Sequence, residues 1–523
     1  MAVNVVTQNF SIENAKKFKS AIADATSYLY LFIAKIHPYA DETSVPAITD
    51  HVGLVDYDVW RDMIGLKRIL PGAVSHGAAR HNWSNNNLYA QYDHTHTALS
   101  SNNYFVLTSA NNVYKCLFNN GGANSTVQPT GTATTILNTA DGYRWKFMYN
   151  ISSTDINAFV ATNYIPVKTL AADDGSVQWD IQQAAVNGAI QVVDVTTGGS
   201  GYLSTGNTAI DAIVSNNNLI VSGTATHTLT LKSNASGTDD VYNGSVIRIT
   251  GGLGIGQVRE IVDYVGSTRE ATVNNAFTVT PNTTSDYVIT PKVTITGDGS
   301  GATAYSNVVA GAISYVNMIA VGSNYSTATV TISANSSHGT GAVGKAMIPP
   351  HGGHGNDPIN ELNGKNLIFN TTLQRSEANS LPIVNDYRRF GLVIDPKYQN
   401  GVSATATRLT QTTRLTLTSV SASGRFTEDT TVTGATSGAT GAVVRFANTN
   451  AGNTTGVLHL TNTSATAFTN GEAVSSSGAN GVVSANTKPD LKPFTGKVLY
   501  IENRQAISRA KDQDEDFKLV FTF

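Results

Sequence analysis

Two histidine-containing stretches carry side chains of the types that bind metal ions. His351 and His354 flank a pair of glycines, and His94 and His96 follow Asp93. Residues two apart in a strand share a face, so the second pair of imidazoles could reach one ion. The simpler interpretation, which we favour for both stretches, is a loop whose histidines hydrogen-bond locally. The sequence therefore predicts no metal site and no cofactor.

Enzymatic chemistry finds little support elsewhere in the chain. The glycines of 251–256 resemble a phosphate-binding loop, but no helix and no Lys-Ser/Thr pair follows them. Cys116 lies in an apolar run, which is typical of a small core residue. Acidic pairs occur at 173–174 and 239–240, within segments that indicate turns. We expect no enzyme activity, although a catalytic triad assembles across a fold and the sequence leaves that alternative open.

Large aromatic residues and arginines are the side chains that most often anchor protein interfaces. Burial in the core explains an aromatic residue equally well, and the sequence does not separate these two interpretations. The candidate interface residues are Arg80, Trp83, Tyr500, Glu502, Asn503 and Arg504.

Composition favours a β-rich protein of several domains. Of the 523 residues only 14% are charged, and Ser, Thr, Asn and Gly take their place. The 34 basic and 37 acidic residues give a net charge of −3, so nucleic-acid binding is not expected. One cysteine excludes an intramolecular disulfide framework. No run has the length of a signal-peptide core or of the ~18 apolar residues of a membrane helix, so we expect synthesis in a reducing cytosol and no membrane insertion.

The last two dozen residues predict a chain end that is tied into a sheet. Strand-like runs occupy 497–501 and 517–523. A terminus made of β-branched and aromatic residues is stable only when it pairs with a strand and packs on a core. Arg504, Arg509 and a group of acidic residues lie between the runs, which indicates a solvated turn or a bulge before the last strand.

The first 180 residues contain helix candidates and several strands. Ser11 is predicted to cap a helix whose inner face carries Ala15, Phe18, Ala21 and Ile22. The other expected elements are a buried strand over 28–35, a helix over 56–64, a hairpin of 103–107 with 113–118 and a turn and strand over 141–149.

Internal repeats indicate β-modules inserted into this first fold. The segment 188–202 recurs as 311–325, and Phe426 recurs as Phe468 within a repeat that can close as a small barrel or sandwich. We therefore predict a mainly β protein with a few short helices, in which a multi-domain host fold carries inserted sandwich-like or barrel-like modules. The expected divisions are host fold at 1–184, inserted repeats at 185–350, host fold at 351–404, a second insertion at 405–487 and host strands at 488–523.

Several landmarks of the predicted host segments occur in a recognisable order. In chain order they read KFKSAI, FIAKIHPY, VWRDMIGLKRIL, ARHNW, VYKCL and DGYRWKFMY, and the end reads ENR, DQ and FTF. This series resembles the baseplate wedge subunits of T-even-type contractile-tailed bacteriophages. The resemblance covers about 1–180, 345–400 and 488–523.

The resemblance implies a structural protein of the virion, placed in the tail baseplate. It implies a homodimer that bridges other wedge proteins, with six wedges around the tail hub. Contacts rearranged between rigid subunits would pass a signal to the contractile sheath. The alternative from another class is a receptor-binding or glycan-binding module anchored on the baseplate, with the inserted modules in contact with the host surface. A glycan depolymerase is the third function considered.

Overall fold

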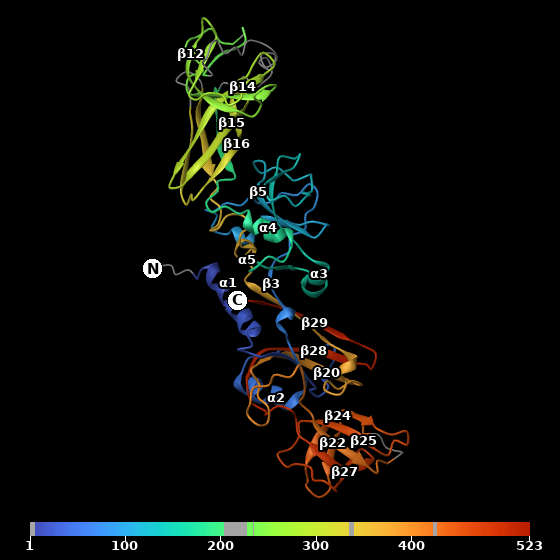
Figure 1. Cartoon of the computed structure of the whole chain (residues 1–523). Coiled ribbons are helices and arrows are strands. Elements are labelled where there is room, and N and C mark those ends of the chain that lie inside the picture. The colour runs from blue at the N-terminus through green and yellow to red at the C-terminus, as the bar shows by residue number, and fades with distance from the viewer. Residues whose placement is uncertain (1–5, 203–226, 234, 334–338, 422–425) are drawn as a thin grey trace. The chain divides into compact units, whose positions relative to one another are not determined.

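The computed structural model describes residues 6–202, 227–233, 235–333, 339–421 and 426–523, and these are mainly β (Figure 1). This confirms the predicted fold class. The chain forms two compact units, each built from separated segments. Unit 1 comprises 1–79, 153–168 and 364–523, and unit 2 comprises 80–152 and 169–363.

The centre of unit 1 is a five-stranded antiparallel sheet with the order β21-β2-β1-β20-β28. Its strands are β1 (Leu29–Ala34), β2 (Met63–Arg68), β20 (Asn385–Ile394), β21 (Arg408–Thr410) and β28 (Lys497–Arg509). Every residue of β1 is buried, because both faces of this central strand are covered. Its neighbour β2 is the next strand in the chain, whereas β20 comes from a distant part of the sequence, so long-range pairing completes the sheet.

A second, four-stranded sheet with the order β29-β19-β3-β8 completes the unit. Its strands are β3 (Val74–Ala79), β8 (Tyr164–Val167), β19 (Asn366–Leu373) and β29 (Glu515–Thr522). Eight residues of β29 pair with β19, and Phe517 packs into the core between the sheets. The expectation that the chain end is tied into a sheet is therefore confirmed. Strand β28 is longer than predicted, because it extends through the polar residues up to Arg509, and β29 begins two residues earlier than predicted.

Helices cover part of unit 1, and one predicted helix cap was wrong. The helices are α1 (Gln8–Ala23), α2 (Val59–Asp62), which follows a π-helical turn (Leu54–Asp58), and α3 (Ser153–Phe159). Ser11 lies inside α1 instead of capping it, since the helix begins three residues earlier. Ile12, Ala15 and Ile22 are its buried residues, and Phe18 packs against Phe369 and Phe523. In the second predicted helix, Met63 and Ile64 belong instead to the following strand.

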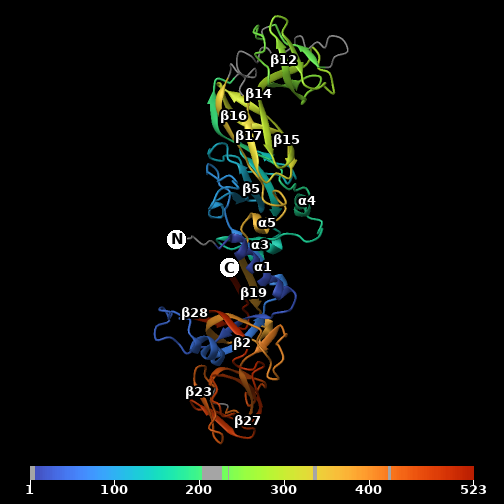
Figure 2. The ribbon, with the colours of Figure 1, turned by 90° about the vertical axis from the view of Figure 1, so that its left-hand side faces the viewer.

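Residues of the second repeat close into a six-stranded barrel with the order β22-β25-β24-β23-β26-β27 (Figure 2). Its strands are β22 (Thr413–Thr418), β23 (Thr431–Gly434), β24 (Thr440–Asn448), β25 (Gly456–Thr461), β26 (Ala473–Ser476) and β27 (Ala479–Thr487). Phe426 and Phe468, at equivalent places in the two copies, both lie in its core. Strand β22 pairs with β25 and β23 pairs with β26, so each copy pairs with its counterpart.

Unit 2 begins with a four-stranded sheet with the order β4-β5-β7-β6. Its strands are β4 (Phe105–Leu107), β5 (Asn112–Phe118), β6 (Leu137–Asn138) and β7 (Arg144–Asn150), and the nearby helices are α4 (Val177–Gln183) and α5 (Pro358–Glu361). The predicted hairpin is confirmed, with Asn111 at φ 59° in its turn. Cys116 is buried in the core beside Tyr114 and Trp145, as its apolar surroundings predicted.

The remaining strands of unit 2 form one ten-stranded sheet, in which β14 is shared by two cores. Its strands are β9 (Val193–Ser200), β10 (Thr228–Thr230), β11 (Ser245–Gly251), β12 (Val258–Val265), β13 (Glu270–Val273), β14 (Asp286–Gly297), β15 (Ser300–Val309), β16 (Ala312–Ser323), β17 (Ala328–Ile332) and β18 (Thr340–Ala346). The first half of β14 pairs with β11 and the second half pairs with β15 and β17.

The repeat of 188–202 and 311–325 has a physical basis in two tyrosines. Tyr202 and Tyr325 are both buried, and each hydroxyl accepts a hydrogen bond from a backbone N–H, that of Ala342 and that of Ala302 respectively. A left-handed glycine precedes each tyrosine by three residues and leaves room for the ring. The recurring Gly-x-x-Tyr pattern therefore marks two equivalent sites in one core, each with a buried tyrosine that is hydrogen-bonded to the backbone.

Candidate assembly interface

Three of the candidate interface residues alternate along β28 and form one hydrogen-bonded series. The hydroxyl of Tyr500 donates to Glu502 Oε2 at 2.5 Å, and Arg504 Nη2 lies 2.5 Å from Glu502 Oε1. Burial, together with the adjacent Glu502 carboxylate, raises the pKa of Tyr500 to about 12. The Tyr500 phenol therefore stays neutral at physiological pH and continues to donate its hydrogen bond to Glu502.

The series runs from the core of unit 1 to its surface. The ring of Tyr500 packs edge-on against Phe521 at 5.0 Å and lies 6.5 Å from Phe390. The Arg504 side chain, at the other end, is 58% exposed. Tyr500 thus has a core role as well as a polar contact, whereas Arg504 is the member that a partner can reach.

Asn503 points to the other face of β28 and holds a loop. Its amide oxygen accepts from Arg389 Nε at 2.9 Å, and its amide nitrogen donates to the Pro46 carbonyl at 3.1 Å. Both functional groups of the side chain are therefore used inside unit 1. This arrangement favours a structural role for Asn503.

A groove of about 410 Å³ lies beside the series, between β28 and β29. Its apolar lining includes Tyr387, Phe390 and Phe517, and its charged lining includes Glu502, Arg504, Asp514, Glu515, Asp516 and Lys518. Within the described residues, β28 pairs only with β20 and β29 pairs only with β19. Each strand therefore presents a free edge, and a free edge can accept a strand from another chain.

The turn between β28 and β29 is exposed at 511–514, as predicted, but Arg509 and Glu515 at its two ends are buried. Arg509 is 1% exposed and forms an ion pair with Glu515, which is also buried. Arg509 Nε donates to the Pro382 carbonyl at 3.2 Å. A buried guanidinium needs such partners, so this pair fixes the end of β28 against the start of β29.

Arg80 and Trp83 belong to unit 2, and the structure gives them local partners. Arg80 Nε donates to Asn82 at 3.0 Å. Trp83 packs at the edge of the core of the first sheet of unit 2, and its indole N–H donates to Ser125 at 3.2 Å. The Trp83 ring is half-buried, so one part of it packs on the core and the other part is exposed.

The histidine stretches are held by charged side chains. His354 is buried, and its Nδ1 accepts from Lys115 Nζ at 3.0 Å, while Lys115 also donates to Glu361 at 2.8 Å. His351 is exposed. In the other stretch, Lys345 donates to both carboxylate oxygens of Asp93 at 2.7 Å. The described ranges contain no group of three His, Cys, Asp or Glu side chains placed to hold a metal ion.

Burial and charge shift the pKa values of Lys115, His354 and Glu361, which together form the Lys115 cluster. Burial and the neighbouring Lys115 charge lower the pKa of His354 to about 4. Burial alone would raise the pKa of Glu361, but Lys115 and His354 together outweigh burial and lower that pKa to about 2. Burial lowers the pKa of Lys115 as well, while Glu361 opposes the change. The cluster is a charge pair sealed in the core, with the Lys115 ammonium also 4.1 Å from the Tyr92 ring centroid.

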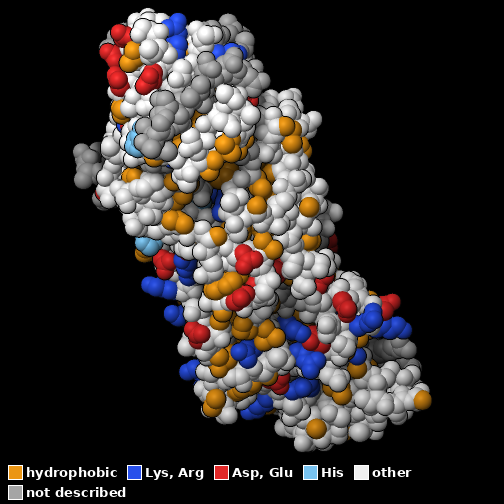
Figure 3. Space-filling model, turned by 45° about the horizontal axis from the view of Figure 1, so that its top comes forward, with side chains coloured by type: hydrophobic (Ala, Val, Ile, Leu, Met, Phe, Trp, Pro, Cys, Tyr) orange, Lys and Arg blue, Asp and Glu red, His pale blue; other side chains and the backbone are white. Residues whose placement is uncertain are grey.

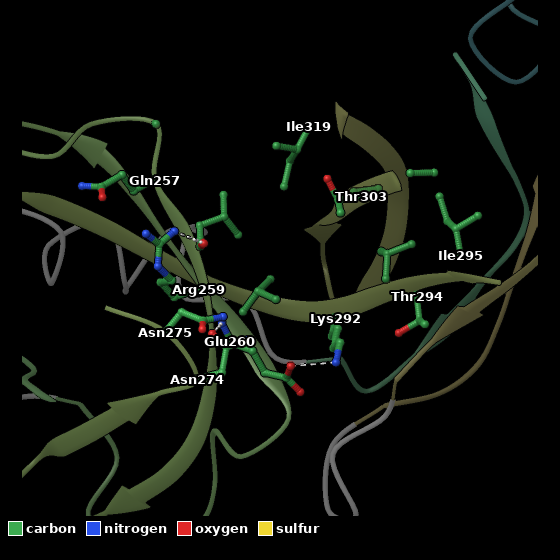
Figure 4. Close-up of a pocket in the computed structure, with 16 residues that line it drawn as sticks. Gln257, Arg259, Glu260, Asn274, Asn275, Lys292, Thr294, Ile295, Thr303 and Ile319 are labelled. Atoms are coloured by element: carbon green, nitrogen blue, oxygen red, sulfur yellow. Dashed lines mark hydrogen bonds and ion pairs between the residues drawn. The ribbon is translucent and has the colours of Figure 1, made fainter. Parts of the chain in front are cut away.

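A larger cleft of about 500 Å³ lies in unit 2, between β12 and the β14–β16 strands (Figure 4). Four of its polar side chains are already engaged. Arg259 donates to the Ala276 carbonyl, and the Gln257 amide both donates and accepts across the same loop. Glu260 and Lys292 form an ion pair at 2.7 Å, drawn as a dashed line in Figure 4. The Glu260–Lys292 pair joins β12 to the shared strand β14.

Uncharged polar side chains and backbone make up most of the surface visible in Figure 3. No helix among the described residues is long and apolar enough to cross a membrane. Comparison with models of protein families and with curated proteins finds no match.

Proposed function

We propose that this protein is a structural component of a contractile phage tail baseplate, in which it links neighbouring wedge proteins. One observation carries the proposal. Three sequence segments that resemble the wedge subunit, at 28–35, 385–396 and 500–504, contribute the adjacent strands β1, β20 and β28. These three segments were singled out by their sequence alone, and in the structure they are hydrogen-bonded neighbours in one sheet. The rigid body of unit 1 is suited to transmit force between partners.

The groove between β28 and β29 is the surface that we assign to assembly. It combines free strand edges with aromatic and charged side chains, which are the elements of a protein interface. In this role the protein forms a homodimer, contacts other wedge proteins in the virion and passes their rearrangement to the sheath. The role requires no cofactor, no catalysis and no nucleic acid.

Sedimentation of the purified protein, alone and mixed with other wedge components, tests the proposal. We expect a dimer that joins a larger complex. The variant Arg504→Glu places a second negative charge beside Glu502 and is expected to weaken assembly about tenfold or more. Lys497→Glu, which changes an exposed lysine at the other end of β28, is the matched control and should assemble normally. A strict monomer that joins no complex would refute the proposal.

The glycan-binding or receptor-binding alternative is favoured by the barrel, which is closed and has its own core. Arg414 near its start pairs with Thr487 at its end, so its two ends lie side by side and the barrel can be removed with a short linker. Baseplates that assemble without residues 413–487 but fail to adsorb to the host would favour this alternative.

A further inference from the structure

A second cleft, of about 470 Å³, lies in unit 1 where the barrel meets the helical turn of 54–62. The barrel is docked there by hydrogen bonds to the Arg61 carbonyl from the Thr461 hydroxyl, at 2.8 Å, and the Asn462 N–H, at 3.1 Å. Trp60, which is buried, contributes to the lining. The cleft has the size of a small-molecule site.

Two exposed aromatic rings mark this cleft. Tyr57 is 56% exposed and Phe494 is 58% exposed, with ring centroids 5.4 Å apart. Water-exposed rings of this size are unfavourable unless something covers them, and here two of them stand together at a concave site. Elsewhere in unit 1, the rings of Tyr500 and Phe517 pack on other aromatics within the core.

The backbone at Phe494 provides an independent observation. Phe494 follows Pro493 in a turn and has φ 63°, in the left-handed region where bulky side chains are strained. Glycine or asparagine is the usual residue at such a turn position after proline. A phenylalanine there neither relaxes the backbone nor buries its ring. Strain of this kind, kept without a packing benefit, indicates a functional position.

The polar lining favours a ligand rich in hydroxyl groups. Within the described part of the chain, the side chains of Asn462 and Thr463 make no hydrogen bond to another residue, and both are exposed in the cleft. The charge of Arg61 is balanced by Asp58 at 3.0 Å and Asp62 at 3.6 Å. The cleft therefore offers amide and hydroxyl partners without a free charge.

The elements around the cleft disfavour an extended peptide. Strand β25 pairs with β22 on one side and β24 on the other, so it offers no free edge. The opposite wall is helical. Recognition must therefore come from side chains. A pyranose ring packs its apolar C–H face on an aromatic ring while its hydroxyls bind amides and hydroxyls, which is the combination present here.

We infer that this cleft binds a neutral pyranose oligosaccharide, with Tyr57 and Phe494 as the stacking platform and Asn462 and Thr463 as hydrogen-bonding partners. This inference is independent of the assembly surface on β28 and β29. A protein that assembles through one end of unit 1 can hold a glycan at the barrel.

The test is saturation-transfer NMR on the full-length protein with three neutral trisaccharides: maltotriose, cellotriose and triacetylchitotriose. Each is used at about 10 mM, tenfold above a Kd of about 1 mM. At least one is expected to bind. Phe494→Gly is expected to weaken its binding about tenfold or more, while the melting temperature stays the same or rises because glycine relaxes the turn.

Phe10→Ala, which changes another exposed phenylalanine far along the chain in α1, is the matched control and should bind as the unmodified protein does. Asn462→Ala separates the polar contribution from stacking and should also weaken binding. Failure of all three trisaccharides to bind would overturn the inference. So would a Phe494→Gly variant that binds sugar normally, or one that instead loses association with other wedge proteins, which would make the rings a protein-binding surface.

Discussion

Lys115 shows how much of unit 2 depends on one side chain. Its ammonium group is fully buried, and its partners His354 and Glu361 come from a loop and helix far along the sequence. Glu361 Oε1 also accepts from the backbone N–H groups of Gly355 and Asp357. The ion pair therefore anchors the glycine-rich loop to β5, and removal of either partner leaves a buried charge uncompensated.

We predict that Lys115→Met destabilises unit 2 by about 3–5 kcal/mol. The reason is that the Glu361 carboxylate remains buried without its cation. Chemical denaturation measures the change, and the double variant Lys115→Met with Glu361→Gln should recover a large part of it. If the double variant is no more stable than the single one, the pair is not coupled as described.

The pH dependence of unit 2 follows from His354. Its pKa is 6.5 when unfolded and about 4 when folded, so the unfolded chain binds the additional proton between these values. The stability from neutral His354 is therefore present above pH 6.5 and is lost as the pH falls towards 4. We expect a steep fall in the melting temperature of unit 2 over this range. His354→Gln, which keeps a hydrogen-bond acceptor without titrating, should flatten it.

Sequence patterns indicated the strand that carries Lys115 but not its environment. An apolar run with one lysine normally places that lysine in water, whereas both faces of β5 are buried here. For His354 the sequence favoured hydrogen bonding within its own loop, and this prediction was wrong, because its partner Lys115 lies 239 residues earlier in the chain. No sequence signal identified that distant lysine, because the contact depends on tertiary packing.

At the scale of elements, the terminal strand β29 contributes to the core of unit 1, although a strand at a chain end often lies at the periphery. Phe517 packs edge-on against Phe390 at 5.1 Å and near Tyr387 at 6.4 Å. The strand thus closes one side of the core between the two sheets of unit 1. A change that is confined to this strand should affect the whole unit.

We predict that Phe517→Ala destabilises unit 1 by about 3–5 kcal/mol, through lost burial and the cavity left behind. Thermal unfolding measures the effect, and Phe10→Ala, an exposed phenylalanine of the same unit, should leave the transition nearly unchanged. An equal effect of the two substitutions would show that β29 does not pack on the core.

Element positions followed from the sequence better than element ends. The alternation around Phe517 predicted its strand, whereas the polar segment of Asn503 to Arg509 resembled a turn. It is strand because β28 lies at a sheet edge, where polar side chains face water. Arg509 was placed in solvent because nothing in the sequence shows that Glu515 meets it in the interior.

At the scale of the whole molecule, two interrupted units share one chain. Each unit has its own cores. The chain passes from unit 1 to unit 2 and back twice, so both units consist of segments that are separated in the sequence. The barrel and the ten-stranded sheet add cores of their own. Cooperative unfolding is expected within cores and weaker coupling between them.

Calorimetry is expected to resolve at least two unfolding transitions. Lys115→Met should lower one of them, and Phe517→Ala should lower a different one, because the two residues lie in separate units. A single transition that both substitutions shift equally would show that the chain unfolds as one cooperative body.

The pairing of β1 with β20 has a consequence for synthesis. Leu29 leaves the ribosome long before its register partner Ile394 is made. At the usual elongation rates of about 5–20 residues per second, the wait lasts roughly 20–70 seconds. During that interval the nascent segment Leu29–Ala34 can pair with β2 but lacks its second neighbour, β20. Its apolar side chains are then a target for chaperones, and host cells rich in holding chaperones should give the higher yield of soluble protein.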